Sequence, residues 1–355
     1  MLPIRKFTDI IILGAAVGLL LICFVSLPAQ EWKRVKDLRG NWKFSLGDNR
    51  SWAGYDYNDT EWDSIFVPAT WEDEGFPGYD GYAWYRKHFR LSPSDLTKNL
   101  YVNLGYIDDA DEVYLNGHFI GFSGSFPPDY YTAYNLERIY RLPMEYLNQI
   151  GKNVLAVRIY DQLQEGGIIR GQIGVYQKAN DLKLLLSLEG SWKFALHDDM
   201  NRKQADYDDS KWKQVMVPAT WETQGYRNYD GFAWYRKEFI IPEELQGKQL
   251  VLVLGKVDDL DEAYLNGKLV GRTGRMKDIS WRAPSDEWLE IRGYELSLTD
   301  IRFGEVNVLA VRVYDALVQG GIYEGPIGIA SYQEYKAWLN KTQKPKSNFI
   351  DNLFK

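Results

Sequence analysis

Most of this chain is one unit written twice, and this duplication constrains the fold more than any other feature of the sequence. Residues 38–44, 67–72 and 79–87 return as residues 188–194, 217–222 and 229–237, all at an offset of 150. The offset reaches 154 at Asn153 and Asn307, which places a length change of four residues between about residues 127 and 138. Surface loops tolerate such changes, and a repeat of this length is the size of a complete domain. The sequence therefore predicts two related domains in tandem.

The composition favours strands and turns over helices. Aromatic residues make up 15% of the 355 residues and glycine occurs 31 times, whereas long stretches rich in Leu, Ala, Glu and Lys are scarce. The net charge of −7 implies an acidic, soluble surface without a basic face. No nucleic-acid partner is therefore expected.

Residues 1–30 stand apart as an export segment. Two basic residues precede an uncharged apolar stretch over residues 10–27, and Pro-Ala-Gln follows. This order predicts a signal peptide, with an uncleaved N-terminal membrane anchor as the alternative, because the stretch is just long enough to span a bilayer. The protein is expected to be periplasmic, secreted or anchored, with no other membrane contact. The single cysteine, Cys23, lies in this stretch, so the exported part has no disulfide.

Each repeat shows a series of short strands separated by turns. Residues 154–160 and 308–314 are the clearest strand candidates, and Asn116-Gly117 gives the strongest signal for a hairpin turn. About eight such strands per repeat predict an all-β protein of two tandem β-sandwich domains of the jelly-roll type. The expected boundaries are 1–30 for the export segment, 31–180 and 181–335 for the two domains, and 336–355 for a polar tail.

Several ordered motifs occur in both repeats. They include Val-Pro-Ala-Thr-Trp-Glu, Ala-Trp-Tyr-Arg-Lys, Asp-Asp-x-Asp-Glu-x-Tyr-Leu-Asn-Gly, Arg-x-Tyr and Leu-Ala-Val-Arg-x-Tyr-Asp. Over residues 36–178 and 186–332 these motifs resemble the galactose-binding-like jelly-roll domain. This is the sugar-binding domain of family 2 glycoside hydrolases of the β-galactosidase type, and it also occurs in sialate O-acetylesterases. The resemblance implies two such domains in tandem without a catalytic domain.

The resemblance also bears on catalysis. In family 2 enzymes the hydrolytic residues belong to a separate barrel, and a barrel needs about 250 residues, for which the two repeats leave no room. No Gly-x-Ser-x-Gly motif occurs, and the histidines have no metal or triad spacing. No catalytic residues are therefore expected. If the chain is part of an enzyme, the resemblance implies a glycoside hydrolase whose catalytic chain is separate.

The densest group of carboxylates recurs in both repeats. Because calcium prefers several carboxylate oxygens, four of these residues are candidate ligands of a structural calcium ion, and no other cofactor is expected. The candidates are Asp108, Asp109, Asp258 and Asp259. Strand alternation turns the neighbouring Asp111 inward, where we expect it to pair with Arg86 or Arg158.

Flat aromatic faces and fixed polar groups bind sugars, so unshared aromatic residues are of interest. Most tryptophans occur at equivalent positions in both repeats, as Trp84 and Trp234 do, and are expected to pack in the scaffold. Aromatic residues of the length-variable loop differ between the repeats and are candidates for carbohydrate contacts. They are Tyr130, Tyr131, Trp281 and Trp288.

The resemblance implies a second candidate surface. In family 2 enzymes the loop before the Trp-Tyr-Arg strand and the loop after the Val-Arg-x-Tyr-Asp strand reach toward the bound sugar. The matching residues are Tyr79, Asp80 and Asp161 in the first repeat and Tyr229, Asp230 and Asp315 in the second. A nearby charge reverses between Arg170 and Glu324, which predicts that the two domains present different sites.

Three hypotheses on function follow. The leading one is an exported, non-catalytic protein that binds carbohydrate or glycan chains. The first alternative is an accessory subunit or degenerate relative of a β-galactosidase-like glycoside hydrolase, which needs a catalytic partner protein. The second is an adaptor or structural protein that binds other proteins, for example at the cell surface. Aromatic residues clustered at one end of a domain would favour the first, and a broad apolar patch the others.

Overall fold

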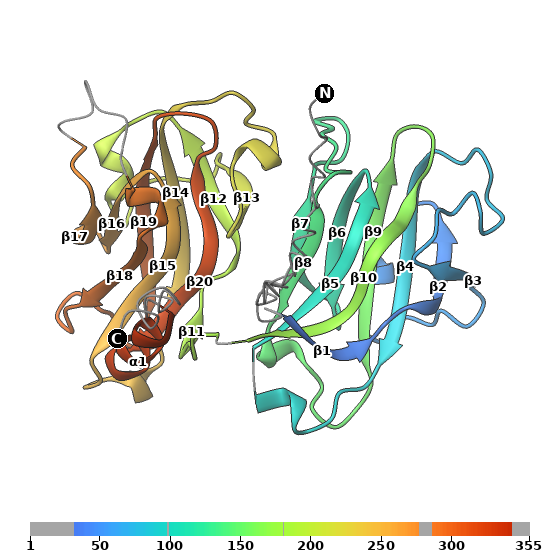
Figure 1. Ribbon diagram of the computed structural model, residues 1–355, viewed down its shortest axis with the longest axis horizontal. Helices are drawn as coiled ribbons and strands as arrows, with labels where there is room; N and C mark the ends of the chain where they lie inside the picture. Colours follow the sequence, from blue (N-terminus) through green and yellow to red (C-terminus); the bar gives the residue numbers. More distant parts are fainter. Residues whose placement is uncertain (1–31, 98, 180, 277–285, 343–355) are drawn as a thin grey trace, which may run out of the picture.

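The computed structural model describes residues 32–97, 99–179, 181–276 and 286–342. These residues form two β-sandwiches in tandem and one α-helix (Figure 1). Each sandwich, which we call a module, packs a six-stranded antiparallel sheet against a four-stranded one. The predicted all-β class is confirmed. The export segment expected at residues 1–30 lies outside the described residues.

The first module contains ten strands and three 3-10 helices. The six-stranded sheet has the order β3-β2-β4-β9-β6-β7, and the four-stranded sheet has the order β1-β10-β5-β8. The bounds are β1 Trp32–Asp37, β2 Gly40–Leu46, η1 Arg50–Ala53, β3 Asp63–Val67, β4 Gly81–Phe89, η2 Asp95–Thr97, β5 Leu100–Asp108, β6 Ala110–Leu115, β7 His118–Ser123, β8 Glu137–Leu142, η3 Met144–Tyr146, β9 Asn153–Asp161 and β10 Gly167–Lys178.

The second module repeats this topology strand for strand. Its sheets have the orders β13-β12-β14-β19-β16-β17 and β11-β20-β15-β18, which are those of the first module with ten added to each number. The bounds are β11 Leu186–Ser187, β12 Gly190–Leu196, η4 Met200–Lys203, β13 Lys213–Val217, η5 Glu222–Gln224, β14 Gly231–Ile240, η6 Glu243–Leu245, β15 Leu250–Asp258, β16 Leu260–Leu265, β17 Lys268–Thr273, η7 Glu287–Leu289, β18 Ile291–Leu296, β19 Val306–Asp315, β20 Gly321–Ser331 and α1 Tyr332–Thr342.

Each module has more strands than the eight expected. The edge strands β1 and β11 were not anticipated, because β1 is mostly polar and exposed and β11 has two residues. Neither carries the apolar alternation by which a half-buried strand is found in a sequence. The hairpin prediction is confirmed, since Asn116 and Gly117 link β6 to β7 with φ angles of 51° and 86°. A two-residue turn of type I′ needs positive φ at both positions.

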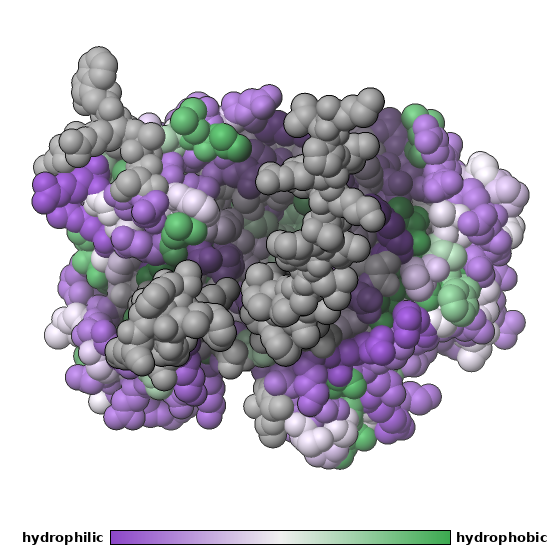
Figure 2. Space-filling view, viewed as in Figure 1, coloured by the Kyte–Doolittle hydropathy of each residue, from purple (hydrophilic) through white to green (hydrophobic). Residues whose placement is uncertain are grey.

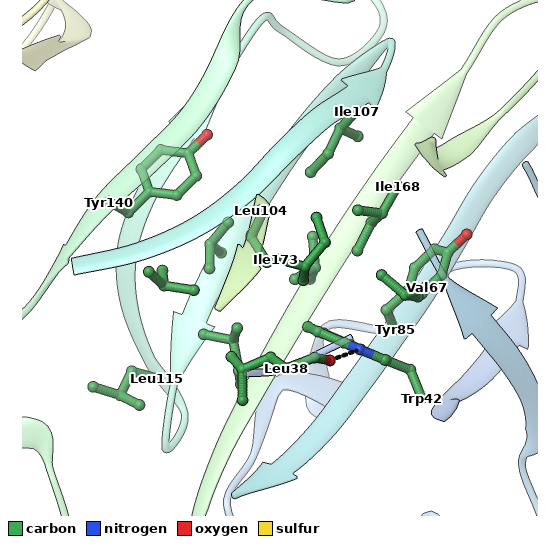
Figure 3. Packing of buried hydrophobic residues seen from close by; sticks show 14 of the residues in the cluster. Leu38, Trp42, Val67, Tyr85, Leu104, Ile107, Leu115, Tyr140, Ile168 and Ile173 are labelled. Atoms are coloured by element: carbon green, nitrogen blue, oxygen red, sulfur yellow. Dashed lines mark hydrogen bonds between the residues drawn. The ribbon is translucent and has the colours of Figure 1, made fainter. Parts of the chain in front are cut away.

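The core of the first module lies between its two sheets (Figure 3). Trp42 and Tyr85 of the six-stranded sheet face Leu104 and Ile173 of the four-stranded sheet. The indole N–H of Trp42 donates to the carbonyl of Leu38 at 2.8 Å, so its polar atom is satisfied. As predicted for scaffold residues, the shared Trp62 and Trp212 pack against buried residues, and the other six shared tryptophans are fully buried. These six are Trp42, Trp71, Trp84, Trp192, Trp221 and Trp234.

Asp111 is buried as predicted, but its predicted partners were wrong. Its carboxylate accepts a hydrogen bond from Nε of Arg138 at 2.7 Å and another from the hydroxyl of Tyr140 at 2.6 Å. Arg86 and Arg158 alternate with the core residues of β4 and β9, so they lie on the outer face of the six-stranded sheet. Asp111 points into the sandwich, and β8 of the opposite sheet supplies the arginine.

Helix α1 covers the outer face of the four-stranded sheet in the second module. Tyr335 packs against Leu182, Val251, Val253 and Ala330. The helix starts before residue 336, where the polar tail was expected to begin, and its apolar side is part of the module. Among the described residues, no helix is both long and apolar enough to cross a membrane.

Candidate functional site

Four loops of the first module meet at one end of its sandwich, at the top of Figure 1. In the first module, Gly81 pairs with Asp161 at the end of β9, and Gly167 pairs with Asp108 at the end of β5. The loop between β7 and β8 joins them, since a backbone N–H of this loop donates to the carbonyl of Asp109 at 2.9 Å. We call this end the carboxylate end. It is defined by Asp108, Asp109 and Asp161 in the first module and by Asp258, Asp259 and Asp315 in the second.

Three carboxylates converge at the carboxylate end of the first module. Oxygen atoms of Asp108, Asp109 and Asp161 lie within 4.8 Å of one another, and the last two residues are buried. Asp109 accepts hydrogen bonds from the Thr132 hydroxyl and from the backbone N–H of Gln162 at 3.0 Å. From the sequence, Asp108 and Asp109 were candidate calcium ligands and Asp161 was a candidate sugar contact. The structure brings all three together.

Crowding changes the protonation of these groups. Burial, followed by the hydrogen bond and charge of Asp109, raises the pKa of Asp108 to about 7. Burial and the charge of Asp109 also raise the pKa of Asp161 to about 7. Burial acts in the same direction on Asp109, but hydrogen bonds from Thr132 and Tyr130 outweigh it and lower the pKa of that carboxyl. Carboxylates this close need a proton or a cation between them, because like charges disfavour ionisation.

The second module reproduces the cluster. Oxygen atoms of Asp258, Asp259 and Asp315 lie within 4.8 Å of one another, and the backbone N–H of Ala316 donates to Asp259 at 3.0 Å. Burial and the hydrogen bond to Asp259 raise the pKa of Asp258 to about 8, and burial raises that of Asp315 to about 7. The raised pKa of the first and third carboxyl group of the cluster thus occurs in both copies.

Buried polar atoms without partners border both clusters. Oδ1 of Asp161 accepts the backbone N–H of Leu163 at 3.3 Å, whereas its Oδ2 has no partner among the described residues. The buried hydroxyl of Tyr85 is also unpaired there, and so are Oδ2 of Asp315 and the hydroxyl of Tyr235. Nearly all buried polar groups are hydrogen-bonded, so these atoms call for a bound water or ion. Clustered carboxylate oxygens fit calcium, which takes hard oxygen ligands.

One arginine in each module fixes the backbone of the cluster. Arg138 donates to the carbonyls of Ile107 and Asp109 at 2.8 and 2.9 Å, while its Nε binds Asp111. Arg292 donates to the carbonyl of the equivalent Asp259 at 2.6 Å. Arg138 is therefore a positioning residue for the carboxylate end. The repeated Arg-x-Tyr motif was the sequence signal that contained it.

An aromatic group lies beside the carboxylates in the first module. The rings of Tyr82 and Tyr160 are 4.8 Å apart, Phe126 is 5.7 Å from Tyr82, and Tyr130 is 5.6 Å from Tyr160. The guanidinium of Arg158 lies over Phe126 at 4.3 Å. Of these residues, Phe126 and Tyr130 belong to the length-variable loop that the sequence indicated. The others were missed because Tyr82 and Tyr160 belong to repeated motifs, which suggested a scaffold role.

The second module keeps part of this group. Phe232 and Tyr314 are 4.9 Å apart, and the guanidinium of Arg312 lies over Phe232 at 4.4 Å. These three residues stand at the positions of Tyr82, Tyr160 and Arg158. A half-buried aromatic pair beside three carboxylates is therefore common to both modules.

Two predicted tyrosines have structural partners. The hydroxyl of Tyr79 donates to the carbonyl of Tyr82 at 2.7 Å, and Tyr229 makes the equivalent bond at 2.6 Å. Both are half-buried, so they hold the loop before β4 and β14 in place. Asp80 and Asp230, which follow them, are exposed at the rim of the carboxylate end.

The aromatic residues of the length-variable loops are placed differently from one another. Tyr131 lies at the boundary between the modules, where its hydroxyl donates to the carbonyl of Glu222 at 3.1 Å and accepts from Nε of Arg227 at 2.8 Å. Trp288 lies in η7 of the second module with 39% of its surface exposed. Trp281 lies outside the described residues.

The comparisons with known proteins point to glycoside hydrolases. A family model described as the second all-β domain of β-galactosidase matches residues 48–165, inside the first module. The chain is 26% identical over 175 residues to a proposed β-glucuronidase of Formosa agariphila, which covers 46% of this chain and 16% of the relative. It is 26% identical over 155 residues to the β-galactosidase BoGH2A of Bacteroides ovatus, covering 40% of this chain and 17% of the relative.

These matches fit a non-catalytic domain of the family 2 type. The resemblance inferred from the repeated motifs is confirmed. A solved β-glucuronidase from glycoside hydrolase family 2 has a TM-score of 0.37 and 16% identity, over 82% of this chain and 28% of that chain. The chain spans about a sixth of the length of the two curated relatives, and the family model that it matches describes an all-β domain.

Proposed function

We propose that this chain is an exported, non-catalytic protein that binds carbohydrate at the carboxylate ends of its two modules. The observation that carries the proposal is the half-buried aromatic pair beside three carboxylates, which occurs in both modules. In the first module the pair is Tyr82 and Tyr160, and in the second it is Phe232 and Tyr314. Retention of the aromatic pair and of the three carboxylates in both copies supports a shared role.

The chemistry of a sugar suits such a surface. A pyranose offers C–H groups on one face and hydroxyl donors around its rim, so an aromatic ring packs on the first and carboxylates accept from the second. Asp80 and Asp230 are exposed at the rim, and Asp108 and Asp258 are half-buried in the clusters of their respective modules. Arg138 holds the backbone of the cluster in place, which reduces the ordering that binding would require.

The surface polarity favours a sugar over a protein partner. On the face shown in Figure 2, the described residues are mainly hydrophilic, and hydrophobic ones form small, separate groups. A docking surface for a stable protein complex is usually a larger contiguous patch. The adaptor hypothesis has no comparable support on this face.

A second candidate function is that of an accessory subunit in glycoside hydrolysis. The relatives are named β-glucuronidase and β-galactosidase, and the matched region is a small part of each. In this role the modules would bind a glycan for a separate catalytic chain. The purified chain alone would then leave aryl glycosides unhydrolysed, and the same chain would increase turnover by its partner.

A glycan array tests carbohydrate binding directly. The chain from residue 31 onward is probed against neutral and acidic glycans, and hits are measured by calorimetry. We expect Tyr160→Ala and Tyr314→Ala to weaken a hit about tenfold each, since stacking on one ring contributes about 1–2 kcal/mol. Tyr55→Ala is the matched control, because Tyr55 is exposed near the other end of the first module. Absence of any array signal, or equal losses in the control, would refute the proposal.

Export is tested by fractionation. A tagged full-length chain is expected in the periplasm or medium when residues 1–30 are present, and in the cytoplasm when they are deleted. Retention in the membrane fraction at the uncleaved mass would identify these residues as an anchor. Cytoplasmic location of the full-length chain would contradict export.

A further inference from the structure

The candidate sites of the two modules meet at the module boundary. Tyr131 belongs to the loop that supplies Tyr130 and Thr132 to the carboxylate end of the first module. Its hydroxyl contacts Arg227 and the carbonyl of Glu222 at 2.8 and 3.1 Å. Both partners lie in the loop before β14, the loop that also carries Tyr229 and Asp230 of the second site. One loop of the first site is therefore in direct contact with one loop of the second.

The contact continues into the second carboxylate end. The side chain of Glu222 accepts the backbone N–H of Gly320 at 3.1 Å, and Gly320 ends the loop that follows Asp315. The charge of Glu222 also contributes, after burial, to the raised pKa of Asp315. Direct contacts thus connect the two clusters. Thr132 donates to Asp109, its neighbour Tyr131 binds Glu222, and Glu222 binds the loop that follows Asp315.

A second set of contacts holds the linker. Nδ2 of Asn99 in the first module donates to Asp181 and to the carbonyl of Leu182 at 2.8 and 3.2 Å. Leu182 is buried in the cluster that α1 completes on the second module. The modules are therefore joined at the linker as well as at the Tyr131 loop, and both carboxylate ends open toward the same edge of the molecule, the top of Figure 1.

The charge of this edge restricts its ligand. Exposed Asp80 and Glu165 lie in loops of the first carboxylate end, and exposed Asp230 lies in a loop of the second. Of the cations at the boundary, Arg227 lies over the ring of Tyr131 at 4.8 Å, and Lys213 is 3.5 Å from Asp129. A glycan rich in uronic acids would meet like charges, which disfavour association, whereas a neutral glycan would not.

We propose that the two carboxylate ends form one continuous face that binds a single extended, neutral glycan across the module boundary. The proposal rests on the proposed function and specifies its ligand as a polymer and not a monosaccharide. Two sites on one face bind a connected ligand far more tightly than either binds alone, because the second contact becomes intramolecular. The stacked Tyr131 and Arg227 lie where the ligand would cross from one module to the other.

Fragments of β-1,4-galactan are the probe, since one class of relatives is named β-galactosidase. A disaccharide, a tetrasaccharide and an octasaccharide are titrated into the chain in a calorimeter. We expect affinity to rise by about a hundredfold from the disaccharide to the octasaccharide, with one octasaccharide per chain. Oligogalacturonides of the same lengths, which differ by their carboxylates, are expected to bind at least tenfold more weakly.

Matched variants distinguish the contribution of each module to binding from the contribution of the loop contact between the modules. Asp80→Asn and Asp230→Asn, at equivalent positions, should each lower octasaccharide affinity about tenfold or more. Tyr131→Ala should lower octasaccharide affinity and leave disaccharide affinity unchanged. Tyr134→Ala, three residues on at an exposed position, is its control and should change neither.

Three outcomes would overturn the proposal. Two octasaccharides per chain with the affinity of the disaccharide would show independent sites, and the proposed carbohydrate binding would then survive alone. Equal or tighter binding of oligogalacturonides would refute the preference for neutral glycans. Absence of binding to every galactan fragment by the unaltered chain, with no signal on the glycan array, would refute both this proposal and the function on which it rests.

Discussion

The guanidinium of Arg170 lies over the ring of Tyr106, 4.2 Å from its centroid, as a cross-strand pair between β10 and β5. The equivalent pair in the second module is Glu324 with Lys256, whose side chains form a salt bridge of 2.9 Å. The charge reversal noticed in the sequence is therefore matched by a change in its cross-strand neighbour. Each module satisfies this position with its own pair, and the charge presented at this position differs between the modules.

The first prediction concerns this pair. Glu324→Arg alone should destabilise the second module by about 0.5–1 kcal/mol, because it places two cations opposite each other. Adding Lys256→Tyr should restore the stability by recreating the pair of the first module. The interaction term of this double-mutant cycle is measured by chemical denaturation. A term near zero would show that the two positions do not interact.

The second prediction concerns Arg138. Arg138→Ala leaves the buried carboxylate of Asp111 without its cation and should destabilise the first module by about 3–5 kcal/mol. Arg39→Ala, which breaks an exposed pair with Asp37, is expected to change the stability by less than about 1 kcal/mol. Denaturation midpoints of both variants give the comparison. Similar effects of the two substitutions would contradict the buried pairing.

The third prediction separates scaffold from surface tryptophans. Trp84 is fully buried against Tyr114 and Ala156, and Trp84→Ala should destabilise by about 3–5 kcal/mol. Trp288 is 39% exposed, so Trp288→Ala should leave the melting temperature nearly unchanged. Thermal melts of both variants give the test. A large loss of stability for Trp288→Ala would place this residue in the scaffold.

The fold could be predicted well because the chain contains two copies of the same domain. Motifs that recur at a constant offset, such as those around Trp84 and Trp234, had to be shared structure, and both residues are buried. The Asn-Gly turns were also predictable, since positive φ at two adjacent positions is a local requirement. The edge strands β1 and β11 were not, because β1 is polar and β11 has two residues.

The sequence identified several residues of the candidate site but not that they lie together. Asp108 and Asp161 were indicated as residues of two different sites, and their proximity depends on the pairing of β10 with β5 and of β4 with β9. The alternation of residues along a strand predicts which side chains face the core, but it does not predict which strand ends lie next to each other. The role of Tyr131 at the module boundary depends on the packing of two folded modules, and no pattern within one repeat reports it.

The fourth prediction concerns acid stability. Burial alone would raise the pKa of Asp59, but hydrogen bonds from Arg86 and His88 outweigh it and lower that pKa. A carboxyl with a lowered folded pKa stabilises the fold above its unfolded pKa of about 3.9, and this stability is lost as the pH falls through the folded value. Asp209, which binds Arg236, behaves in the same way in the second module.

Asp59→Asn should therefore reduce the loss of stability between about pH 4 and pH 2, while lowering the stability at neutral pH. Asp209→Asn should do the same for the second module. Denaturation midpoints across this pH range are compared with those of Asp80→Asn, an exposed control. An unchanged pH dependence in both buried variants would rule out these ion pairs as the source of the acid lability.

The last prediction concerns calcium at the carboxylate ends. Asp161 and Asp315 are fully buried, each has one oxygen without a partner among the described residues, and each lies within 4.8 Å of two further carboxylates. A bound calcium ion would neutralise this charge and satisfy those oxygens. After treatment with a chelator, addition of calcium at about a hundredfold excess over its dissociation constant should stabilise a module by about 2.7 kcal/mol, or about 5–10 °C in melting temperature.

Single substitutions assign this effect to the modules. Asp161→Asn should remove the calcium-dependent shift of the first module, Asp315→Asn that of the second, and the double variant should not respond. Asp80→Asn should keep both shifts, because Asp80 is exposed outside the cluster. The opposite outcome is that calcium does not change the stability of the unaltered chain, while both Asn variants are more stable than it. Shared protons would then hold the carboxylates together, because an amide removes the charge repulsion that a proton would otherwise relieve.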